Sequence, residues 1–420
     1  MADVPELDMT DPALLRDPSA AYVRAAADSP VARLTGPGFA FWVVLRHAEG
    51  RAVLADPRLR TREDSYQRPD VPAGCLPYMT TMSELNGAEH ARLRRLVAPA
   101  FTPRQAERFR PRVEAIVDAL LDELPGHRSD DGPGDGPGDG PGDGPGDGPG
   151  DGPGDGMVDL LAHFARPLPM EVICELTGIP AADRPRWRAW GADVAAGHGA
   201  AFAAAIPGIL EGAKAAVARA RAEPGDDLIS ELARVQEEDG DRLSETELVT
   251  MVWQLVLAGQ TPTNLIANSV AALHEHPGQL AALRADPALM PGAVEELMRW
   301  CGPQLLTIPR FTTEDVEIGG VTVPEGEPVT VAIPAANRDP RVFADPGRFD
   351  VGRDAAGQLG FAHGPHFCAG ASLARVQTAV ALGSLLRRFP GLELAGPPRR
   401  VPDPGTARLL SLPVTLGTAG

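Results

Sequence analysis

The sequence predicts a mainly α-helical protein with a small β region, a fold of the α+β class. The first observation is a long helical pattern from Ser244 to His276, which is apolar on nearly all faces and therefore typical of a buried central helix. The second is a helical pattern from Ala369 onward, directly after a loop rich in glycine and proline. The third is a set of short β patterns between turn residues, such as Val31–Leu34 and Phe41–Leu45.

Composition narrows the possible functions. The chain has 420 residues, of which 43% are hydrophobic, enough for a sizeable core. Its net charge of −18 disfavours nucleic acid and anionic membranes as partners. Because the chain shows neither a long apolar run nor a secretory signal pattern, we expect no membrane anchor and a cytoplasmic location. The four cysteines are scattered, which argues against a disulfide framework.

The first hundred residues alternate between element types. A short helix is predicted near Ala20–Ala27, a β-hairpin follows from the two strand patterns above, and His47–Ala55 is predicted as another short helix. From Thr61 to Asn86 the chain contains several prolines and little periodicity, so a long irregular loop is expected. Loops of this length in a compact domain are usually functional or disordered.

Residues 131–156 form a low-complexity insert, in which Asp-Gly-Pro-Gly occurs six times in succession. Without apolar residues the insert cannot offset the entropy of ordering, and its glycine and proline content disfavours helix and sheet. We expect a disordered acidic surface loop between two helices, with a role as an acidic tether as the alternative.

The remaining elements are predicted from periodicity and turn residues. Helical segments are expected over Val158–Gly178, over Ala181–Glu223 with a break at Pro207, and over Asp226–Val235. Three short strands (Val316–Ile318, Val321–Val323 and Val329–Ile333) should form a small sheet, and the tail (Leu392–Leu394 with Leu409–Leu416) should form another hairpin.

Cys368 lies at the end of the loop that precedes the last predicted helix. A thiol near a helix N-terminus ionises more easily, and a thiolate is the form that binds a soft metal. Three other interpretations compete: a buried structural cysteine, a zinc ligand with His363 and His366, and the nucleophile of a Cys–His hydrolase. No CxxC motif is present to support zinc.

The stretch Phe361-Ala-His-Gly-Pro-His366-Phe-Cys368-Ala-Gly370 resembles the haem-binding loop of the cytochrome P450 family, Phe-Gly-x-Gly-x-His-x-Cys-x-Gly. The resemblance implies that Cys368 is the axial thiolate of a haem iron and that His366 lies beside a haem propionate. Phe361 and Gly370 belong to the same cofactor-binding loop. Ala362 replaces the first glycine, which we expect to matter little, because alanine is tolerated wherever φ is negative.

Further residues in order along the chain match the same family. His90 and Arg94 are four residues apart on a predicted basic helix, so they share a face and could hold two carboxylates. In the family, His-x-x-x-Arg shortly before Phe-Thr-Pro, here residues 101–103, grips the haem propionates. Arg310 matches the family's propionate-binding arginine at the end of an extended segment.

Glu296 and Arg299 alone would suggest only a surface helical ion pair. The P450 family has Glu-x-x-Arg at this distance before the cysteine as a buried structural pair. Asn337-Arg338-Asp339-Pro340 and Phe349-Asp350 recur with it here, so the resemblance implies a buried pair.

The central helix contains Ala258-Gly259-Gln260-Thr261-Pro262, where glycine and proline predict a local kink. In the family, Ala/Gly-Gly-x-Asp/Glu-Thr forms a groove over the haem, and its acid and alcohol deliver protons. This chain is one residue short and lacks the carboxylate. The resemblance implies that Gly259 lies at the haem and that Gln260 and Thr261 are the catalytic residues. The alternative alignment places Pro262, instead of Thr261, at the position of the family's alcohol.

The resemblance covers the chain outside the insert and implies a single domain over residues 1–420, with haem b between the central helix and the helix that follows Cys368. It implies a dioxygen-dependent monooxygenase that hydroxylates a medium-sized apolar or aromatic natural product in bacterial secondary metabolism. One alternative is oxidative radical coupling, by C–C or C–N bond formation, of aromatic substrates such as cyclic dipeptides. Another is a non-catalytic haem-binding auxiliary protein. The expected pocket residues are Trp253, Val256, Leu257, Ala258, Leu306, Thr307 and Ile308.

The implied partners are the small-molecule substrate, a ferredoxin and an NAD(P)H-dependent ferredoxin reductase. Four arginines could form a locally basic docking face for the ferredoxin despite the negative net charge: Arg92, Arg95, Arg104 and Arg375. A monomer is expected.

Overall fold

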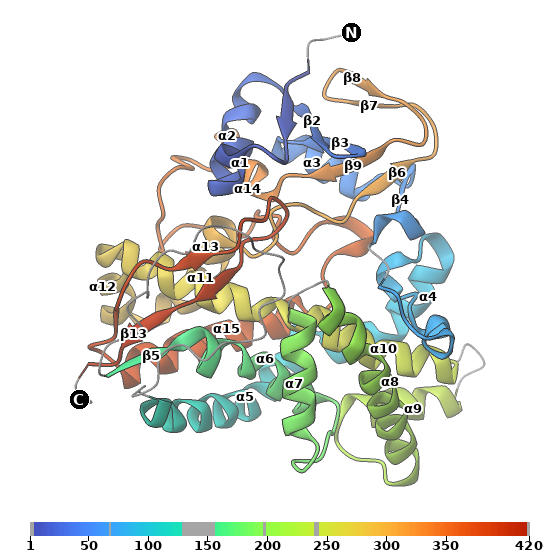
Figure 1. The fold of residues 1–420 in the computed structure, drawn as a ribbon, viewed down its shortest axis with the longest axis vertical. Coiled ribbons are helices and arrows are strands. Elements are labelled where there is room, and N and C mark those ends of the chain that lie inside the picture. Colours follow the sequence, from blue (N-terminus) through green and yellow to red (C-terminus); the bar gives the residue numbers. More distant parts are fainter. Residues whose placement is uncertain (1–3, 67–68, 128–155, 196–198, 239–242, 418–420) are drawn as a thin grey trace.

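The computed structural model describes residues 4–66, 69–127, 156–195, 199–238 and 243–417. Helices dominate and the strands gather into small sheets, as predicted. In Figure 1 the strands β1, β2, β3 and β9 lie at the top, and α5, α7, α8, α9 and α10 lie in the lower half. Apart from Gly156, the repeat insert at 131–156 lies outside the described residues.

The helices of the described part are α1 (Pro12–Arg16), α2 (Pro18–Asp28), α3 (His47–Ala55), α4 (Gly87–Val97), α5 (Pro103–Glu123), α6 (Pro167–Leu176), α7 (Arg184–Ala195), α8 (Gly199–Ala222), α9 (Leu228–Glu238), α10 (Glu245–Gly259), α11 (Thr261–Glu275), α12 (Pro277–Ala285), α13 (Met290–Cys301), α14 (Ile333–Ala336) and α15 (Ala371–Arg388). The strands are β1 (Glu6–Asp8), β2 (Val31–Gly36), β3 (Phe39–Val44), β4 (Leu59–Arg60), β5 (Met157–Asp159), β6 (Arg310–Thr312), β7 (Val316–Ile318), β8 (Val321–Val323), β9 (Pro328–Val331), β10 (Glu393–Leu394), β11 (Arg399–Arg400), β12 (Leu409–Ser411) and β13 (Pro413–Thr415).

The largest sheet has the strand order β1-β2-β3-β9-β6-β4. The predicted hairpin forms its centre, since β2 and β3 pair antiparallel. The predicted sheet of three neighbouring strands is corrected: β7 and β8 form a separate hairpin, whereas β9 joins β3 and β6 in the large sheet. The pairing of β9 with β3 links residues nearly 300 positions apart, and no local pattern specifies such a contact.

The helical expectations hold with two corrections. The segment predicted as one helix over Val158–Gly178 begins with the strand β5 and a π-helical turn at Leu161–Ala165, before α6. Pro207 does not break α8, which continues through it. A proline removes one backbone donor, but α8 has buried residues on both sides of Pro207, and this packing holds the helix together.

Helix α8 is the one helix of the described part that is long and apolar enough to cross a membrane by length and composition. Its buried side chains, including Phe202, Ile206 and Leu210, belong to a core cluster with residues of α7, α9 and α10. This packing is that of a core helix.

The long central pattern is interrupted at Gln260, which separates α10 from α11, so the predicted kink is confirmed. Helix α10 begins with a capping box, in which Ser244 Oγ accepts a bond from the Glu247 N–H and the Glu247 carboxylate accepts one from the Ser244 N–H. Helix α11 packs against α13 and α15. The interrupted helix therefore runs through the middle of the molecule beside the helix that follows Cys368.

The rings of His127 and His163 stack, with their centroids 4.1 Å apart. Burial, and then the positive charges of His127 and Arg166, lower the pKa of His163 below its usual 6.5, although Asp159 opposes this shift. Since the folded protein binds a proton at His163 less readily than the unfolded chain does, stability should fall as the pH drops below 6.5. We expect the His163→Gln variant to lose less stability than the native protein between pH 7.5 and pH 5.5. Urea unfolding at the two pH values measures this difference, and an unchanged pH dependence would contradict it.

Candidate functional site

A cavity of about 420 Å³ lies where several distant parts of the chain meet. Its lining residues come from the loop before α4 and α4 itself, from α6, from the α10/α11 junction, from the segment before β6, and from the loop that ends at Cys368. Among the residues predicted for the site, the cavity brings together His90, Arg94, Ala258, Gly259, Thr261, Leu306, Thr307, Ile308, Arg310, Phe361, His366, Cys368 and Gly370.

Cys368 faces the cavity, and protein surrounds it on its other sides. Its backbone N–H donates to the Phe361 carbonyl over 2.9 Å, which closes the loop. Gly364 has φ +72° in this loop, and a Cβ there would lie 2.6 Å from the Leu54 carbonyl oxygen, so only glycine fits.

The expected easy ionisation of Cys368 is not found, because burial raises the pKa of its thiol in the protein alone. Helix α15 begins only at Ala371, so Cys368 lies before the first turn. A backbone hydrogen bond from Gly370 and the charges of Arg94 and Arg375 act in the opposite direction. A bound cation such as a haem iron would have to supply the rest of the stabilisation of the thiolate.

One end of the cavity is cationic. The rings of His90 and His366 stack with centroids 4.2 Å apart. Arg94 donates to the Phe367 carbonyl over 2.6 Å, and Arg310 donates to the Leu54 carbonyl over 2.7 Å. Burial and the neighbouring arginines lower the pKa of His90, and burial together with His90, Arg310 and Arg94 lowers that of His366 to about 4.

Neither guanidinium of this end has a carboxylate within ion-pair distance among the described residues. Burial lowers the pKa of both Arg94 and Arg310, which shows that their charge is held at a cost. Buried charges are normally paired, so a ligand with two anionic groups is expected beside them. These groups fit a haem: the Cys368 thiol is a suitable ligand for the iron, and the guanidiniums of Arg94 and Arg310 are suited to its two propionate carboxylates.

Ala362 departs from our expectation, because its φ is +60° rather than negative. Its N–H closes a turn by donating to the Leu359 carbonyl over 2.9 Å. A methyl group in the left-handed region is strained, so the substitution of the family glycine has an energetic cost.

We therefore expect the Ala362→Gly variant to unfold at higher urea concentration, with a gain of about 1 kcal/mol in the free energy of unfolding. The control is Ala281→Gly, at an exposed position within α12. This variant should lose about 1 kcal/mol in the free energy of unfolding, because glycine is less favourable than alanine inside a helix. Equal losses in both variants would show that the strain at residue 362 is negligible.

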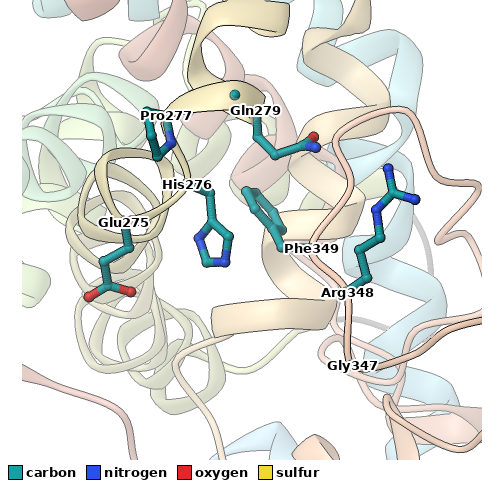
Figure 2. Close-up of a pocket in the computed structure, with 8 residues that line it drawn as sticks. Glu275, His276, Pro277, Gln279, Gly347, Arg348 and Phe349 are labelled. Atoms are coloured by element: carbon teal, nitrogen blue, oxygen red, sulfur yellow. The ribbon is translucent and has the colours of Figure 1, made fainter.

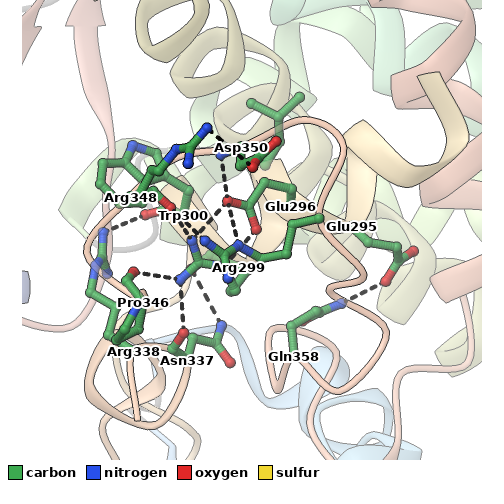
Figure 3. A network of polar contacts seen from close by, with 12 residues as sticks. Glu295, Glu296, Arg299, Trp300, Asn337, Arg338, Pro346, Arg348, Asp350 and Gln358 are labelled. Carbon is green, nitrogen blue, oxygen red and sulfur yellow. Dashed lines mark hydrogen bonds and ion pairs between the residues drawn. The ribbon is translucent and has the colours of Figure 1, made fainter. Parts of the chain in front are cut away.

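Glu296 and Arg299 are buried as a pair on α13, with exposed fractions of 0% and 1%. The guanidinium binds the carboxylate through two bonds of 2.6 and 2.8 Å. It also donates to three backbone carbonyls, those of Asn337, Pro346 and Arg348 (Figure 3). The pair thus fixes the segment between α14 and the loop of Cys368 onto α13.

The α10/α11 junction presents one stripe of residues to the cavity. Ala258, Thr261, Pro262 and Leu265 follow the i, i+3, i+4, i+7 spacing of a helix face, and all line it. Gly259 also borders the cavity, and a side chain there would overlap Ile173 of α6. Thr261 and Pro262 therefore both lie at the wall of the cavity.

Gln260 falls outside this stripe, which corrects its predicted place beside Thr261. Its side chain is buried, and a Cβ placed on Gly191 of α7 would lie 3.3 Å from its amide nitrogen. The amide thus points toward α7 and not into the cavity. Neither of its polar atoms has a hydrogen-bond partner among the described residues.

Three of the predicted pocket residues lie on the wrong face of α10. Trp253 packs in the core, with its ring centroid 6.3 Å from that of Phe202. Val256 is buried in the same cluster, and Leu257, which is 36% exposed, does not line the cavity. The prediction took consecutive apolar positions, whereas a helix offers a cavity only every third or fourth residue.

Several lining residues escaped the prediction. Tyr66, Met82 and Ser83 come from the irregular loop at 61–86, and Gln254 precedes Ala258 by one turn. Helix α6 adds Pro169, Val172, Ile173 and Leu176. The helical spacing from Ala258 back to Gln254 was a usable signal, but α6 approaches the cavity only through tertiary packing.

The predicted basic docking face carries less net positive charge than its four arginines suggest, because two of them form ion pairs. Arg92 pairs with Glu247 of α10, and Arg375 pairs with Glu295 of α13 while its guanidinium lies over the Phe361 ring. These two charges are locally balanced. Arg104 is exposed at the start of α5.

A separate open depression lies between the end of α11, the start of α12 and residues 347–349 (Figure 2). The His276 ring contacts the rings of Trp300 and Phe349, and its Nδ1 lies 2.9 Å from the Ala272 carbonyl oxygen. Its lining residues share none with the cavity of Cys368. This depression contains a packed, hydrogen-bonded histidine and is separate from the cavity of Cys368.

Comparison with known proteins agrees with this geometry. Residues 208–413 match the family model described as Cytochrome P450. The chain is 40% identical to "Cytochrome P450 107B1" of Saccharopolyspora erythraea, over 94% of this chain and 93% of that protein. It is 38% identical to "6-deoxyerythronolide B hydroxylase" of the same organism, over 89% of each chain.

Among solved structures, the chain is similar to "The cytochrome P450 enzyme CxnD for C-S bond formation in chuangxinmycin biosynthesis". The TM-score is 0.80 at 32% identity, and the match covers 100% of this chain and 98% of that chain. With the thiol, the cationic end and the buried Glu296–Arg299 pair in place, these matches settle the family. The chain belongs to the cytochrome P450 family of monooxygenases, whose cofactor is haem b.

Proposed function

We propose that this P450 hydroxylates a medium-sized, apolar or aromatic natural product of bacterial secondary metabolism. The observation that carries the proposal is a cavity with the Cys368 thiol at its wall, the guanidiniums of Arg94 and Arg310 at one end, and mainly apolar side chains elsewhere. These include Val172 and Ile173 of α6, Leu255 of α10, and Leu306 and Ile308 before β6. Such a lining favours an apolar ligand oriented by few polar groups. A relative named as a hydroxylase supports the reaction.

Each part of the chain has a distinct task in this function. Haem, when bound, supplies the activation of dioxygen with electrons from a redox partner. Cys368 would hold the iron as a thiolate, and Arg94 and Arg310 would hold the propionates. The apolar walls exclude water and hold the substrate against the reacting centre.

Proton delivery in this chain differs from the acid and alcohol arrangement implied by the family motif. No carboxylate occurs among the described residues that line the cavity. The Thr261 hydroxyl is the polar side chain of the α10/α11 junction that borders the cavity. We infer that Thr261 passes protons together with solvent or with a hydroxyl group of the substrate, and general acid help of this kind is worth about 10²- to 10⁴-fold.

Oxidative coupling of aromatic substrates is the second candidate. It needs less proton delivery than a full hydroxylation cycle, so the missing carboxylate favours it. The similarity to an enzyme described for C–S bond formation also supports coupling as a second reaction of this fold.

For electron supply we propose an NAD(P)H-dependent ferredoxin reductase and a ferredoxin, and a monomeric, cytoplasmic enzyme. The exposed Arg104 at the start of α5 supports an acidic carrier, since opposite charge steers association. The packing of α8 into the core supports a location away from the membrane.

The test is the absorption spectrum of the dithionite-reduced protein under carbon monoxide, compared with Cys368→Ala. A Soret band shifted strongly to the red in the native protein and lost in the variant is expected. Turnover of an aromatic and macrocyclic library under ¹⁸O₂ then separates the reactions: hydroxylation labels the product, whereas coupling gives unlabelled, joined rings. A histidine-type spectrum that the variant leaves unchanged would overturn the proposal.

A further inference from the structure

We propose that Ser83 donates a hydrogen bond to a neutral oxygen acceptor of the substrate, such as a ketone, lactone or amide carbonyl. Ser83 belongs to the 3₁₀ turn Met82–Glu84 in the loop before α4, and it lines the cavity. The inference rests on the proposed function, because it concerns the ligand of the same cavity.

The argument begins with the amide of Gln254, whose orientation is fixed by two partners. The Met82 N–H donates to Gln254 Oε1 over 3.2 Å, so the oxygen must face Met82. The amide nitrogen then faces Ser83 and donates to its Oγ over 3.0 Å. A flipped amide would place a nitrogen donor against the Met82 N–H donor, which is unfavourable.

Ser83 Oγ is therefore an acceptor toward Gln254, and its own hydrogen must point elsewhere. None of the described residues accepts a hydrogen bond from this hydroxyl. The backbone of Ser83 is also held, because the Tyr66 hydroxyl donates to the Ser83 carbonyl over 2.9 Å. A half-buried hydroxyl with a fixed backbone and a fixed acceptor role is prepared to donate into the cavity.

The charge distribution of the cavity selects a neutral acceptor. Its two guanidiniums, Arg94 and Arg310, lie at the end where Cys368 and His366 are, and the haem carboxylates occupy them in the proposed function. The loop of Ser83 and the lining residues of α6 contribute no charged side chain to the described lining. A carboxylate at Ser83 would thus be desolvated without a counter-charge, whereas a carbonyl needs only the one donor.

The test uses the matched ligands cyclododecanone and cyclododecane, which differ in a single carbonyl group. Their dissociation constants are measured on the haem-loaded protein from the ligand-induced Soret shift. Ser83→Ala should weaken cyclododecanone binding by about three- to tenfold, the value of one neutral hydrogen bond, and leave cyclododecane binding unchanged. Ser83→Thr, which keeps the hydroxyl, should restore ketone binding. Ser65→Ala, in the same loop but outside the cavity lining, should change neither.

Three outcomes would overturn the inference. In the first, Ser83→Ala weakens the binding of both ligands equally, which indicates that Ser83 only positions the loop. In the second, Ser83→Ala leaves cyclododecanone binding unchanged. The third outcome is that the native protein binds no ketone although its reduced carbon monoxide spectrum is that of thiolate-ligated haem. Failure of the spectrum itself would instead overturn the proposed function. The two failures are therefore distinguishable.

Discussion

Replacement of Arg299 by leucine should remove about 3–5 kcal/mol from the free energy of unfolding, because Glu296 would keep its charge in a fully buried site after losing its bidentate partner. Arg353 contacts the same carboxylate at 3.3 Å but cannot reproduce the two bonds. A loss of this size is a large part of the stability of a typical domain. Urea unfolding, followed by haem absorbance and circular dichroism, measures it.

The control is an exposed pair with the same spacing. Glu107 and Arg110 of α5 are also three residues apart, and we expect Glu107→Gln to cost about 0.5 kcal/mol or less. Replacing both Glu296 and Arg299 by apolar residues should not restore stability, since the carbonyls of Asn337, Pro346 and Arg348 would lose their donor. Full recovery in the double variant would show that the ion pair alone matters.

Replacement of Arg310 by methionine should weaken haem binding by roughly 10- to 100-fold, the value of about 1.5–3 kcal/mol for a hydrogen bond to a charged group. Arg310 is buried and without a carboxylate partner in the described part of the chain, so its charge is available to a propionate. The measurement is haem transfer from the holoprotein to an excess of apomyoglobin, followed by absorbance.

Arg104→Met is the matched control, because Arg104 is exposed on α5 and outside the cavity. Its haem transfer should equal that of the native protein. If Arg310→Met also retained haem normally, Arg310 would not hold the cofactor, and its bond to the Leu54 carbonyl would be its whole role.

Several parts of the site could be predicted because their information is local. The loop from Phe361 to Gly370 is contiguous, and the spacing of a helix places His90 with Arg94 and Glu296 with Arg299 on shared faces. The burial of Glu296 and Arg299 was implied only by the resemblance to the family, since the pair alone would suggest a surface ion pair. The kink at Gln260 follows from glycine and proline within an apolar pattern. These signals, through the resemblance that they carry, identified Cys368, His90 and Arg94 as cavity residues without tertiary information.

Other parts depended on packing. Trp253, Val256 and Leu257 are apolar like the true lining residues, and only the docking of α6 and α8 decides which face of α10 is buried in the core and which borders the cavity. The same holds for Gln260, whose polarity suggested catalysis but whose position points it toward α7. Composition does not encode the rotation of a helix about its axis.

Contiguous motifs carried the resemblance to the family, and that resemblance implied the thiol ligand and the burial of Glu296 with Arg299. Helical and strand periodicity predicted the order of most elements. Three features could be seen only in the folded chain: the left-handed conformation of Ala362, the ion pairs of Arg92 and Arg375 with acidic partners, and the hydrogen bond from Gln254 to Ser83. Each of these depends on long-range contacts or on the closure of a turn, and the free energy of such contacts is set by neighbours that the local sequence does not specify.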